Sequence, residues 1–284
     1  MMGDMFSDLE QMGFANIAID DDALFGSDKP AANKSSAQAK EQDEKSDQEY
    51  EQEALFDKKY ECPLCDAKFS QKAVRTGKTR LVSTDTDLHH KFKYFDPIKY
   101  DIIACPKCGY AAMGQKSFDS ISSLQRKLLK EQVQASFKGL PAVGELFTYD
   151  DAIVRYKLAL YSCIVKKSKN SERAYLCLKI AWLYRDKKED MPETEENYDE
   201  KQKKCEEEEK SYLQKAYNGF GAAVQAEMFP ICGMDEMTFN YLYADLARRS
   251  GDIDMARKML GTILISKTAT AALKEKARVI KDLL

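Results

Sequence analysis

Two cysteine pairs carry the most specific chemistry in the sequence. Residues 62–65 read C-P-L-C and residues 105–108 read C-P-K-C. Two residues between cysteines let one tight turn aim both sulfurs at a single point, and two such turns supply the four soft ligands that tetrahedral Zn²⁺ prefers. Because four thiolates fill the coordination sphere and leave no position for water, we expect a structural zinc rather than a catalytic one. The predicted ligands are Cys62, Cys65, Cys105 and Cys108.

The other residues that could do chemistry form no catalytic set. His89 and His90 are the two histidines of the chain, and zinc needs neither once four cysteines bind it, so we expect both to pack in a loop. A role as a ligand or as an acid–base group is the alternative. The sequence has no P-loop, dinucleotide fingerprint, HExxH or GxSxG motif. We therefore expect a protein that is not an enzyme, and a thiol or zinc-dependent enzyme is the least favoured interpretation. The cysteines without a CxxC partner are expected to pack in helices: Cys163, Cys177, Cys205 and Cys232.

The composition favours a cytoplasmic protein. Of its 284 residues, 44% are apolar, which can build a core, and 32% are charged. No apolar run approaches the ~18–20 residues that a membrane helix needs, and the acidic first residues lack the basic start of a signal peptide. In a reducing compartment, paired CxxC motifs indicate metal binding rather than disulfides. The net charge of -3 gives no general attraction to nucleic acid.

The chain divides into four predicted segments. Residues 1–25 hold a short apolar and acidic motif, either a weakly ordered terminus or a segment that docks onto a partner or onto the chain's own helices. Residues 26–56 are rich in Ser, Ala, Gln, Glu and Lys and are predicted to be a disordered linker, because they bury too little apolar surface to offset chain entropy. Residues 57–116 combine the cysteine pairs with short strand-like stretches, which predicts a zinc-ribbon-like module. Residues 117–284 read as helical.

Apolar residues at helical spacing predict seven helices in this last segment. The third, at about residues 174–186, is apolar nearly all round and should be the most buried. A Gly-Asp turn at residues 251–252, followed by Ala256 where two helices cross, resembles a tetratricopeptide hairpin, although the closing proline of that repeat is absent. The predicted fold is mainly α: a small β zinc-ribbon-like module followed by a tetratricopeptide-like helical array. The other helices are predicted at about residues 120–138, 150–164, from Pro192 to 226, 235–250, 252–265 and from 269 to the end.

Basic residues outnumber acidic ones between the cysteine pairs, and aromatic residues are interleaved with them. Such a surface on a zinc ribbon can bind RNA or DNA, and an ordinary charged surface is the simpler explanation. A nucleic-acid-associated regulator is therefore the alternative function. The candidate contact residues are Lys72, Arg75, Lys78, Arg80, Lys91 and Lys93.

Several motifs occur here in one combination. They are C-P-L-C at residues 62–65, K-Y-D-I-I-A-C-P-K-C-G-Y-A-A at 99–112, A-W-L-Y-R at 181–185, and Y-L followed by R-R-S-G-D at 241–252. This combination resembles the bacterial domain of unknown function 2225 family over about residues 57–284, and Arg75 with Asp85 or Asp87 also matches recurring positions of that family. The resemblance implies a zinc-ribbon-like start and a tetratricopeptide-like helical end, and it implies no activity.

These patterns together predict a non-enzymatic protein-interaction adaptor. Stacked helix pairs leave a concave surface that typically binds peptides or proteins, while a structural Zn²⁺ holds the β module in shape. The expected partner is a protein or peptide, with no membrane association. The candidate groove residues are Tyr156, Trp182, Arg185, Tyr241 and Arg248.

Overall fold

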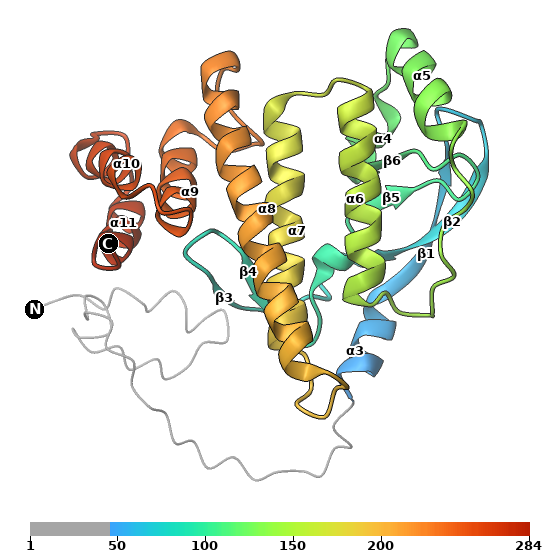
Figure 1. Ribbon diagram of the computed structural model, residues 1–284, viewed down its shortest axis with the longest axis horizontal. Coiled ribbons are helices and arrows are strands. Elements are labelled where there is room, and N and C mark those ends of the chain that lie inside the picture. The colour runs from blue at the N-terminus through green and yellow to red at the C-terminus, as the bar shows by residue number, and fades with distance from the viewer. Residues whose placement is uncertain (1–45) are drawn as a thin grey trace, which may run out of the picture. The chain divides into compact units, whose positions relative to one another are not determined.

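Nine α-helices and three two-stranded antiparallel sheets make up residues 46–284, the part of the chain that the computed structural model describes (Figure 1). This confirms the prediction of a mainly α protein with a small β module. The predicted motif at residues 1–25 and most of the predicted linker lie outside the described residues.

The predicted disordered linker, residues 26–56, extends too far at its C-terminal end. Helix α3 spans Asp47–Ala54, and a reciprocal capping box between Ser46 and Glu49 begins it. Glu51, which reads as a solvated residue in the sequence, is buried, accepts a hydrogen bond from Tyr100 Oη (2.7 Å) and pairs with Lys99 (2.6 Å). The polar composition of this stretch was therefore a poor guide, because its buried acid has partners about fifty residues away.

The strands form three separate hairpins. Strand β1 pairs with β2 from Leu55↔Val74 to Glu61↔Lys68, β3 pairs with β4, and β5 pairs with β6. The short stretches predicted as strands around the cysteine pairs are thus extended, as expected. The strands and the 3₁₀ turn between them are β1 (Leu55–Glu61), β2 (Lys68–Val74), β3 (Leu81–Thr84), β4 (His90–Phe92), η1 (Pro97–Tyr100), β5 (Ile102–Ala104) and β6 (Ala111–Met113).

The predicted helices are present with shifted ends. The first, expected from Ser120, is instead capped by Ser122 and runs into a π-helical turn, and the short helix α4 precedes it. The helices are α4 (Gly114–Asp119), α5 (Ser123–Leu129) with its π turn η2 (Lys130–Gln134), α6 (Tyr149–Val165), α7 (Asn170–Glu189), α8 (Tyr198–Ala226), α9 (Glu236–Arg249), α10 (Ile253–Ile265) and α11 (Ala271–Lys281).

Helix α7 lies at the centre of the helical part. It packs between α6 and α8, and α8 packs in turn on α9 (Figure 1). The prediction that this helix is the most buried is confirmed, since side chains all round it, from Ala174 to Asp186, are buried. Helices α9 and α10 form the predicted hairpin, with Ala256 fully buried. The tetratricopeptide likeness of the whole array stays a prediction.

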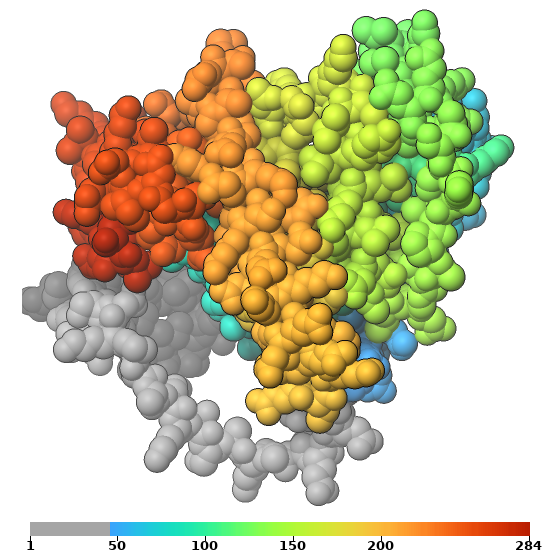
Figure 2. Space-filling view, viewed as in Figure 1, coloured from blue at the N-terminus to red at the C-terminus, as the bar shows by residue number. Residues whose placement is uncertain are grey.

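The β module and the helices pack together in shared apolar clusters. Ile102, Ala104 and Ala111 of strands β5 and β6 belong to the same apolar cluster as α6, α7 and α8. A second cluster joins the cysteine knuckles to Val165 at the end of α6. On the face shown in Figure 2, the helices cover most of the strands. Within residues 46–284, no helix is both long and apolar enough to cross a membrane.

Candidate metal centre and buried charge network

The two C-P-x-C pairs fold into matching knuckles. In the first, Cys62 N–H donates to the Ala67 carbonyl (2.9 Å) and Asp66 N–H donates to the Cys62 carbonyl (2.9 Å). In the second, Cys105 N–H donates to the Tyr110 carbonyl (2.9 Å) and Gly109 N–H to the Cys105 carbonyl (3.0 Å). Each turn ends in a residue with positive φ, 57° at Asp66 and 76° at Gly109. Strands β1 and β5 lead into these turns and so fix where the sulfurs point.

The four sulfurs lie at the spacing of a tetrahedral metal site. Cys62 Sγ is 3.6 Å from Cys108 Sγ, Cys65 Sγ is 3.7 Å from Cys105 Sγ, and all four lie within 4.8 Å of one another. With Zn–S bonds of about 2.3 Å, neighbouring sulfurs of a tetrahedron are about 3.8 Å apart. A disulfide would instead need about 2.0 Å between sulfurs. The cysteine cluster therefore fits a bound metal ion.

The protonation of the cluster also favours a cation. Hydrogen bonding to Cys105 raises the pKa of the Cys62 thiol to about 12 and also raises the pKa of Cys108. Hydrogen bonds from Cys108 and Cys62 lower the pKa of Cys105 to about 2. Of these three thiols, the hydrogen bonds thus favour the thiolate form at Cys105. A divalent cation would remove this restriction, because metal binding displaces thiol protons.

Gly109 is required by the second knuckle for a steric reason as well as a conformational one. A Cβ on this residue would lie 2.4 Å from Cδ2 of Phe137, far inside contact distance. Its φ of 76° is also one that side-chain-bearing residues rarely adopt. The segment after η2 therefore packs directly on the backbone of the second knuckle.

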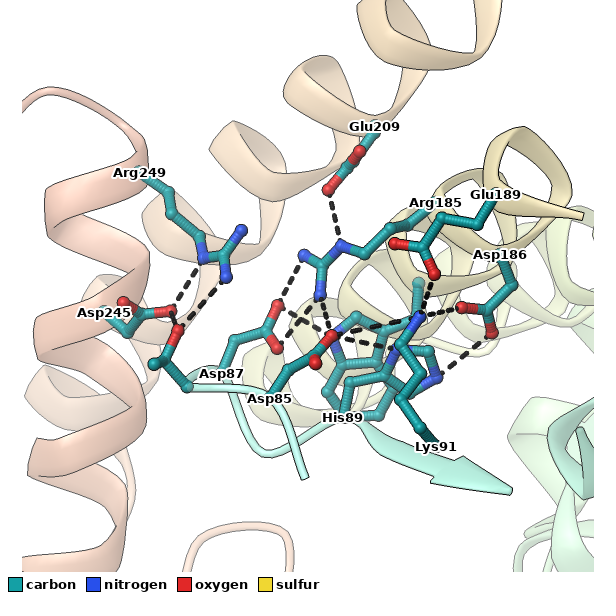
Figure 3. A network of polar contacts seen from close by, with 12 residues as sticks. Asp85, Asp87, His89, Lys91, Arg185, Asp186, Glu189, Glu209, Asp245 and Arg249 are labelled. Atoms are coloured by element: carbon teal, nitrogen blue, oxygen red, sulfur yellow. Dashed lines mark hydrogen bonds and ion pairs between the residues drawn. The ribbon is translucent and has the colours of Figure 1, made fainter. Parts of the chain in front are cut away.

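A second polar site lies where the β3–β4 turn meets α7 and α8 (Figure 3). The Arg185 guanidinium donates to three carboxylates: Asp87 at 2.6 Å, Asp85 at 2.9 Å and Glu209 at 2.8 Å. Trp182 Nε1–H also donates to Asp87 (3.1 Å), which is fully buried. Burial raises the pKa of Asp87, but the charge of Arg185 more than offsets this, so the pKa lies below its usual value. The turn is thus held by side chains almost 100 residues away.

The same turn is also fixed to α9. Thr86 Oγ1–H donates to Asp245 (2.9 Å), and Arg249 donates both to Asp245 (2.7 Å) and to Thr86 (3.1 Å) (Figure 3). Asp245 is fully buried and also accepts from Arg248 (2.7 Å). One turn of the β module therefore bonds directly to α7 and α9, and Arg185 links it to Glu209 of α8.

His89 follows this turn and lies against two further carboxylates. Its ring stacks on Trp182 with centroids 4.8 Å apart, and its Nε2 is 3.2 Å from Asp186 Oδ2 and 3.5 Å from Asp96 Oδ2. Burial lowers the pKa of His89, but the adjacent carboxylates of Asp186 and Asp96 raise it overall. The expectation that His89 only packs in a loop missed these acids. The one sequence signal was the D-T-D-L-H-H run at residues 85–90.

Comparison with known proteins agrees with the motifs. The model of a bacterial family described as uncharacterized proteins conserved in bacteria, DUF2225, matches residues 55–284. The chain belongs to the DUF2225 family. A relative from Borreliella burgdorferi, described as an uncharacterized protein, is 26% identical over 157 residues, which cover 49% of this chain and 56% of the relative. The chain thus spans about half the length of this relative. No solved structure matches the chain.

In this DUF2225 protein, most residues predicted for a peptide groove lie in the interior. Tyr156, Trp182, Arg185 and Tyr241 are buried, and Tyr156 Oη–H donates to the Ile98 carbonyl (3.1 Å). Arg248 is partly exposed and pairs with Asp245. These residues therefore do not line an open groove. In the sequence, the aromatic residues among them fit a buried core as well as they fit a binding groove. The carboxylates that pair with Arg185 are too distant in the sequence to be foreseen.

The six residues predicted for nucleic-acid contact divide into two kinds. Lys72 pairs with Asp57 (3.2 Å), and Lys91 pairs with Asp186 and Glu189, so part of their charge is neutralised within the protein. The others are exposed in the loop between β2 and β3 and directly after β4: Arg75, Lys78, Arg80 and Lys93.

An open groove does occur between the N-terminal turns of α9 and α11. Its volume is about 520 Å³, and Leu88 of the β3–β4 turn forms part of its wall. Met237, Leu273 and Lys276 also line it. None of these residues was predicted to be part of a groove.

Proposed function

We propose that this protein is a non-enzymatic interaction adaptor of the bacterial cytoplasm whose cysteine cluster holds a structural Zn²⁺. The observation that carries the zinc part is the mutual distance of the four sulfurs, within 4.8 Å. Four sulfur ligands complete a tetrahedral zinc and leave no position for a reacting water, which supports a structural role. A reducing compartment would keep these thiols available to the metal.

The position of the cluster supports this role. The two knuckles close the ends of the β1–β2 and β5–β6 hairpins, which have only two strands each. Isolated hairpins are marginally stable in water. A metal between them would fix both hairpins against α6 through the apolar cluster that contains Val165.

The groove between α9 and α11 is the surface that we propose for a partner. It is lined by Met237, Leu273 and Leu88, with Lys276 at its side. A short peptide segment with apolar side chains would fill it, in the manner of peptides that dock between helices. The motif at residues 1–25 contains apolar side chains of this kind, so its sequence makes it one candidate peptide for the groove.

Site-specific photo-crosslinking in bacterial cells tests the adaptor function. A photoreactive residue replaces Ala272, an exposed residue of the groove, and in a matched control it replaces Lys281, exposed on the same helix outside the groove. We expect a discrete crosslinked protein or peptide at position 272 that is absent at 281. Crosslinks of equal yield at both positions, or none at 272, would contradict the proposal.

Elemental analysis tests the metal. The purified full chain should hold one Zn²⁺ in the cysteine cluster, and Cys105→Ser should lose it. A folded wild type with no zinc and freely reactive thiols would contradict the structural-zinc part alone.

The exposed basic residues support the alternative function, nucleic-acid binding, which can be tested. Lys93 lies over the ring of Tyr94 (4.8 Å), and its backbone N–H donates to the carbonyl of Arg80 (3.0 Å), which is also exposed. If this surface binds RNA or DNA, affinity for a labelled oligonucleotide should fall steeply with salt and weaken in Arg80→Glu. Absence of binding at low salt would remove this alternative.

A further inference from the structure

The cluster around His89 leaves buried polar atoms without hydrogen bonds. Both ring nitrogens of His89 and Oδ2 of Asp96 are buried and have no hydrogen-bond partner among the described residues. His89 is only 1% exposed, and Asp96 is 8% exposed. Orphaned atoms of this kind cost about 1–3 kcal/mol each, and more when charged, so their gathering at one point calls for an additional ligand.

We propose that His89, Asp96 and Asp186 bind a divalent transition-metal ion at a second site, separate from the cysteine cluster. One nitrogen of His89 and one oxygen from each carboxylate lie within 4.8 Å of one another. Imidazole and carboxylate are harder ligands than thiolate and suit Mn²⁺, Fe²⁺ or Zn²⁺. The two sites would therefore differ in which metals they prefer.

The distances fit a metal better than they fit direct hydrogen bonds. His89 Nε2 is 3.2 Å from Asp186 Oδ2 and 3.5 Å from Asp96 Oδ2, without hydrogen-bond alignment to either. Ligand atoms about 2.1 Å from a common cation are about 3.0–3.4 Å apart at octahedral and tetrahedral angles. The two distances from His89 thus match those between ligands of one shared cation to about 0.1 Å, and the third pair lies within 4.8 Å.

One oxygen of each carboxylate is already engaged, so Asp96 and Asp186 each have one free oxygen for a metal. Asp96 Oδ1 caps η1 by accepting from Ile98 N–H (3.0 Å), and Asp186 Oδ1 accepts from Lys91. His89 Nδ1 faces the Asp85 carboxylate at 3.8 Å. A carboxylate behind the distal ring nitrogen is the usual support of a metal-binding histidine, because it fixes the ring and its proton.

Rigid elements hold these ligands in place. The His89 ring is stacked on Trp182 at an interplanar angle of 7°, Asp186 projects from the central helix α7, and Asp96 is the N-cap of η1 (Figure 3 shows His89 and Asp186). Such pre-organisation reduces the entropy lost on binding.

The carboxylates also line an accessible space. Asp96 and Asp186 form part of the wall of a cavity of about 310 Å³, together with Tyr149 and Asp190. His89 lies behind these acids and does not line the cavity. A metal held by the three ligands would therefore have its remaining coordination positions on the cavity side, where water can enter and complete them.

The charges around Asp96 and Asp186 favour a bound cation over a set of ion pairs among protein side chains alone. Lys91 pairs with Asp186 and Glu189, while Arg185 is occupied by Asp85, Asp87 and Glu209. Asp96 has no Lys or Arg partner among the described ion pairs, and the nearest basic group is the ring of His89. A protonated His89 would balance one negative charge, whereas a divalent ion balances both Asp96 and Asp186.

Trp182, the single tryptophan of the chain, provides a direct test because it stacks on the proposed ligand His89. Mn²⁺ is titrated into the full chain loaded with one equivalent of Zn²⁺, since thiolates prefer Zn²⁺ to Mn²⁺ and the cysteine cluster is then filled. Bound Mn²⁺ is counted by electron paramagnetic resonance while Trp182 fluorescence is followed. We expect one ion per chain, with paramagnetic quenching that saturates at the same concentration.

Two substitutions give the comparison. Asp96→Asn keeps an oxygen for capping η1 but removes the charged ligand, and it should weaken Mn²⁺ binding at least tenfold. Asp190→Asn alters a carboxylate on the wall of the same cavity outside the ligand set and should change affinity less than twofold. Circular dichroism checks folding, and Asp186→Asn replaces Asp96→Asn if the latter does not fold.

Two results would overturn the proposal. One is equal loss of affinity in Asp96→Asn and Asp190→Asn, which would indicate loose binding to the acidic cavity wall. The other is a folded wild type whose Trp182 fluorescence follows pH but not Mn²⁺, Co²⁺ or Zn²⁺, which would indicate an imidazolium ion pair only. Neither result bears on the cysteine cluster or on the groove.

Discussion

Arg185 is the side chain that joins the β3–β4 turn to the helices. It is buried and donates to Asp85, Asp87 and Glu209 from a single guanidinium. A planar group with fixed donors can serve three carboxylates at once, which a lysine could not do with the same geometry. The three acids would otherwise repel one another, so the arrangement of the turn depends on this residue.

We predict that Arg185→Met lowers the free energy of unfolding by about 3–5 kcal/mol, because it leaves the fully buried Asp87 without its cation. Arg257→Met is the matched control: Arg257 is mostly exposed and 3.9 Å from Asp254, so its loss should cost less than about 0.5 kcal/mol. Denaturant unfolding of both variants gives the comparison. Similar small losses in the two would show that the network around Arg185 contributes little to stability.

The contrast between the cysteines and Arg185 shows what the sequence could predict at this scale. The cysteine ligands are foreseeable, because C-P-x-C spacing fixes the local geometry of each pair and the repeat of the motif suggests that the pairs meet. Arg185 was expected in a binding groove, since nothing local links it to Asp87, 98 residues earlier. The ligand set proposed around His89 was not foreseen for the same reason: a ligand role for His89 was only the alternative, and nothing local links it to Asp186 on α7.

Helix α7 is the element against which the others are placed. Its periodicity predicted burial on all sides, and α6 and α8 pack on it as expected. Element ends were harder to predict. The sequence of α3 looked like linker because its helical signal is a capping box in a polar stretch, and its anchoring contacts to Lys99 and Tyr100 are long-range.

We predict opposite effects for two glycine substitutions in helices. A Cβ at Gly219 of α8 would lie 2.9 Å from Ala174 Cβ of α7, so Gly219→Ala should destabilise by about 1–2 kcal/mol despite better helix propensity. At Gly261 of α10 nothing lies within 4 Å, so Gly261→Ala should stabilise by about 0.5–1 kcal/mol. Thermal or denaturant unfolding measures both. A stabilising Gly219→Ala would mean that α7 and α8 are not in close contact there.

We also predict that stability falls in alkaline solution through groups on α7. Burial raises the pKa of Cys177 from 9.0 to about 11, and Asp101 raises that of Lys179 above 10.5 although burial opposes it. A raised native pKa stabilises the fold below the unfolded pKa, and this contribution is lost as pH rises through the native pKa. The free energy of unfolding should therefore fall above pH 9.

The variant Cys177→Ala isolates one part of this pH effect. Its overall stability will be lower because a buried side chain is truncated, but its unfolding free energy should change less with pH between 9 and about 11 than that of the wild type. Denaturant unfolding at several pH values measures the slopes. Identical slopes would show that the Cys177 thiol does not contribute.

At the scale of the whole described unit, the β module is not packed separately from the helices. Strands β5 and β6 contribute Ile102 and Ala111 to the main helical cluster, and the knuckles pack with Val165 of α6. The β3–β4 turn bonds to Arg185 of α7 and to Asp245 of α9, and Arg185 also bonds to Glu209 of α8. The sequence suggests two separate parts, a zinc module and a helical segment. In the structure, these two parts pack against each other.

We therefore predict that metal removal destabilises residues 46–284 as a whole rather than the knuckles alone. Stripping the full chain with a chelator should lower the midpoint of a single thermal transition by roughly 10 °C or more, since a structural zinc contributes several kcal/mol and each kcal/mol shifts a protein of this size by about 2–4 °C. Hydrogen exchange should rise in the knuckles and also in the last turns of α6, where Val165 packs.

Adding Zn²⁺ back should restore the transition, whereas Mn²⁺ should not, because thiolates bind it weakly. Cys105→Ser should behave like the stripped protein even with Zn²⁺ present, which assigns the effect to the cysteine cluster and not to the site at His89. Two separate transitions, with α6 to α8 equally protected in both states, would mean that the β module unfolds independently. Because the clusters around Tyr110 and Tyr156 meet along α6, the coupled outcome is the one that the packing requires.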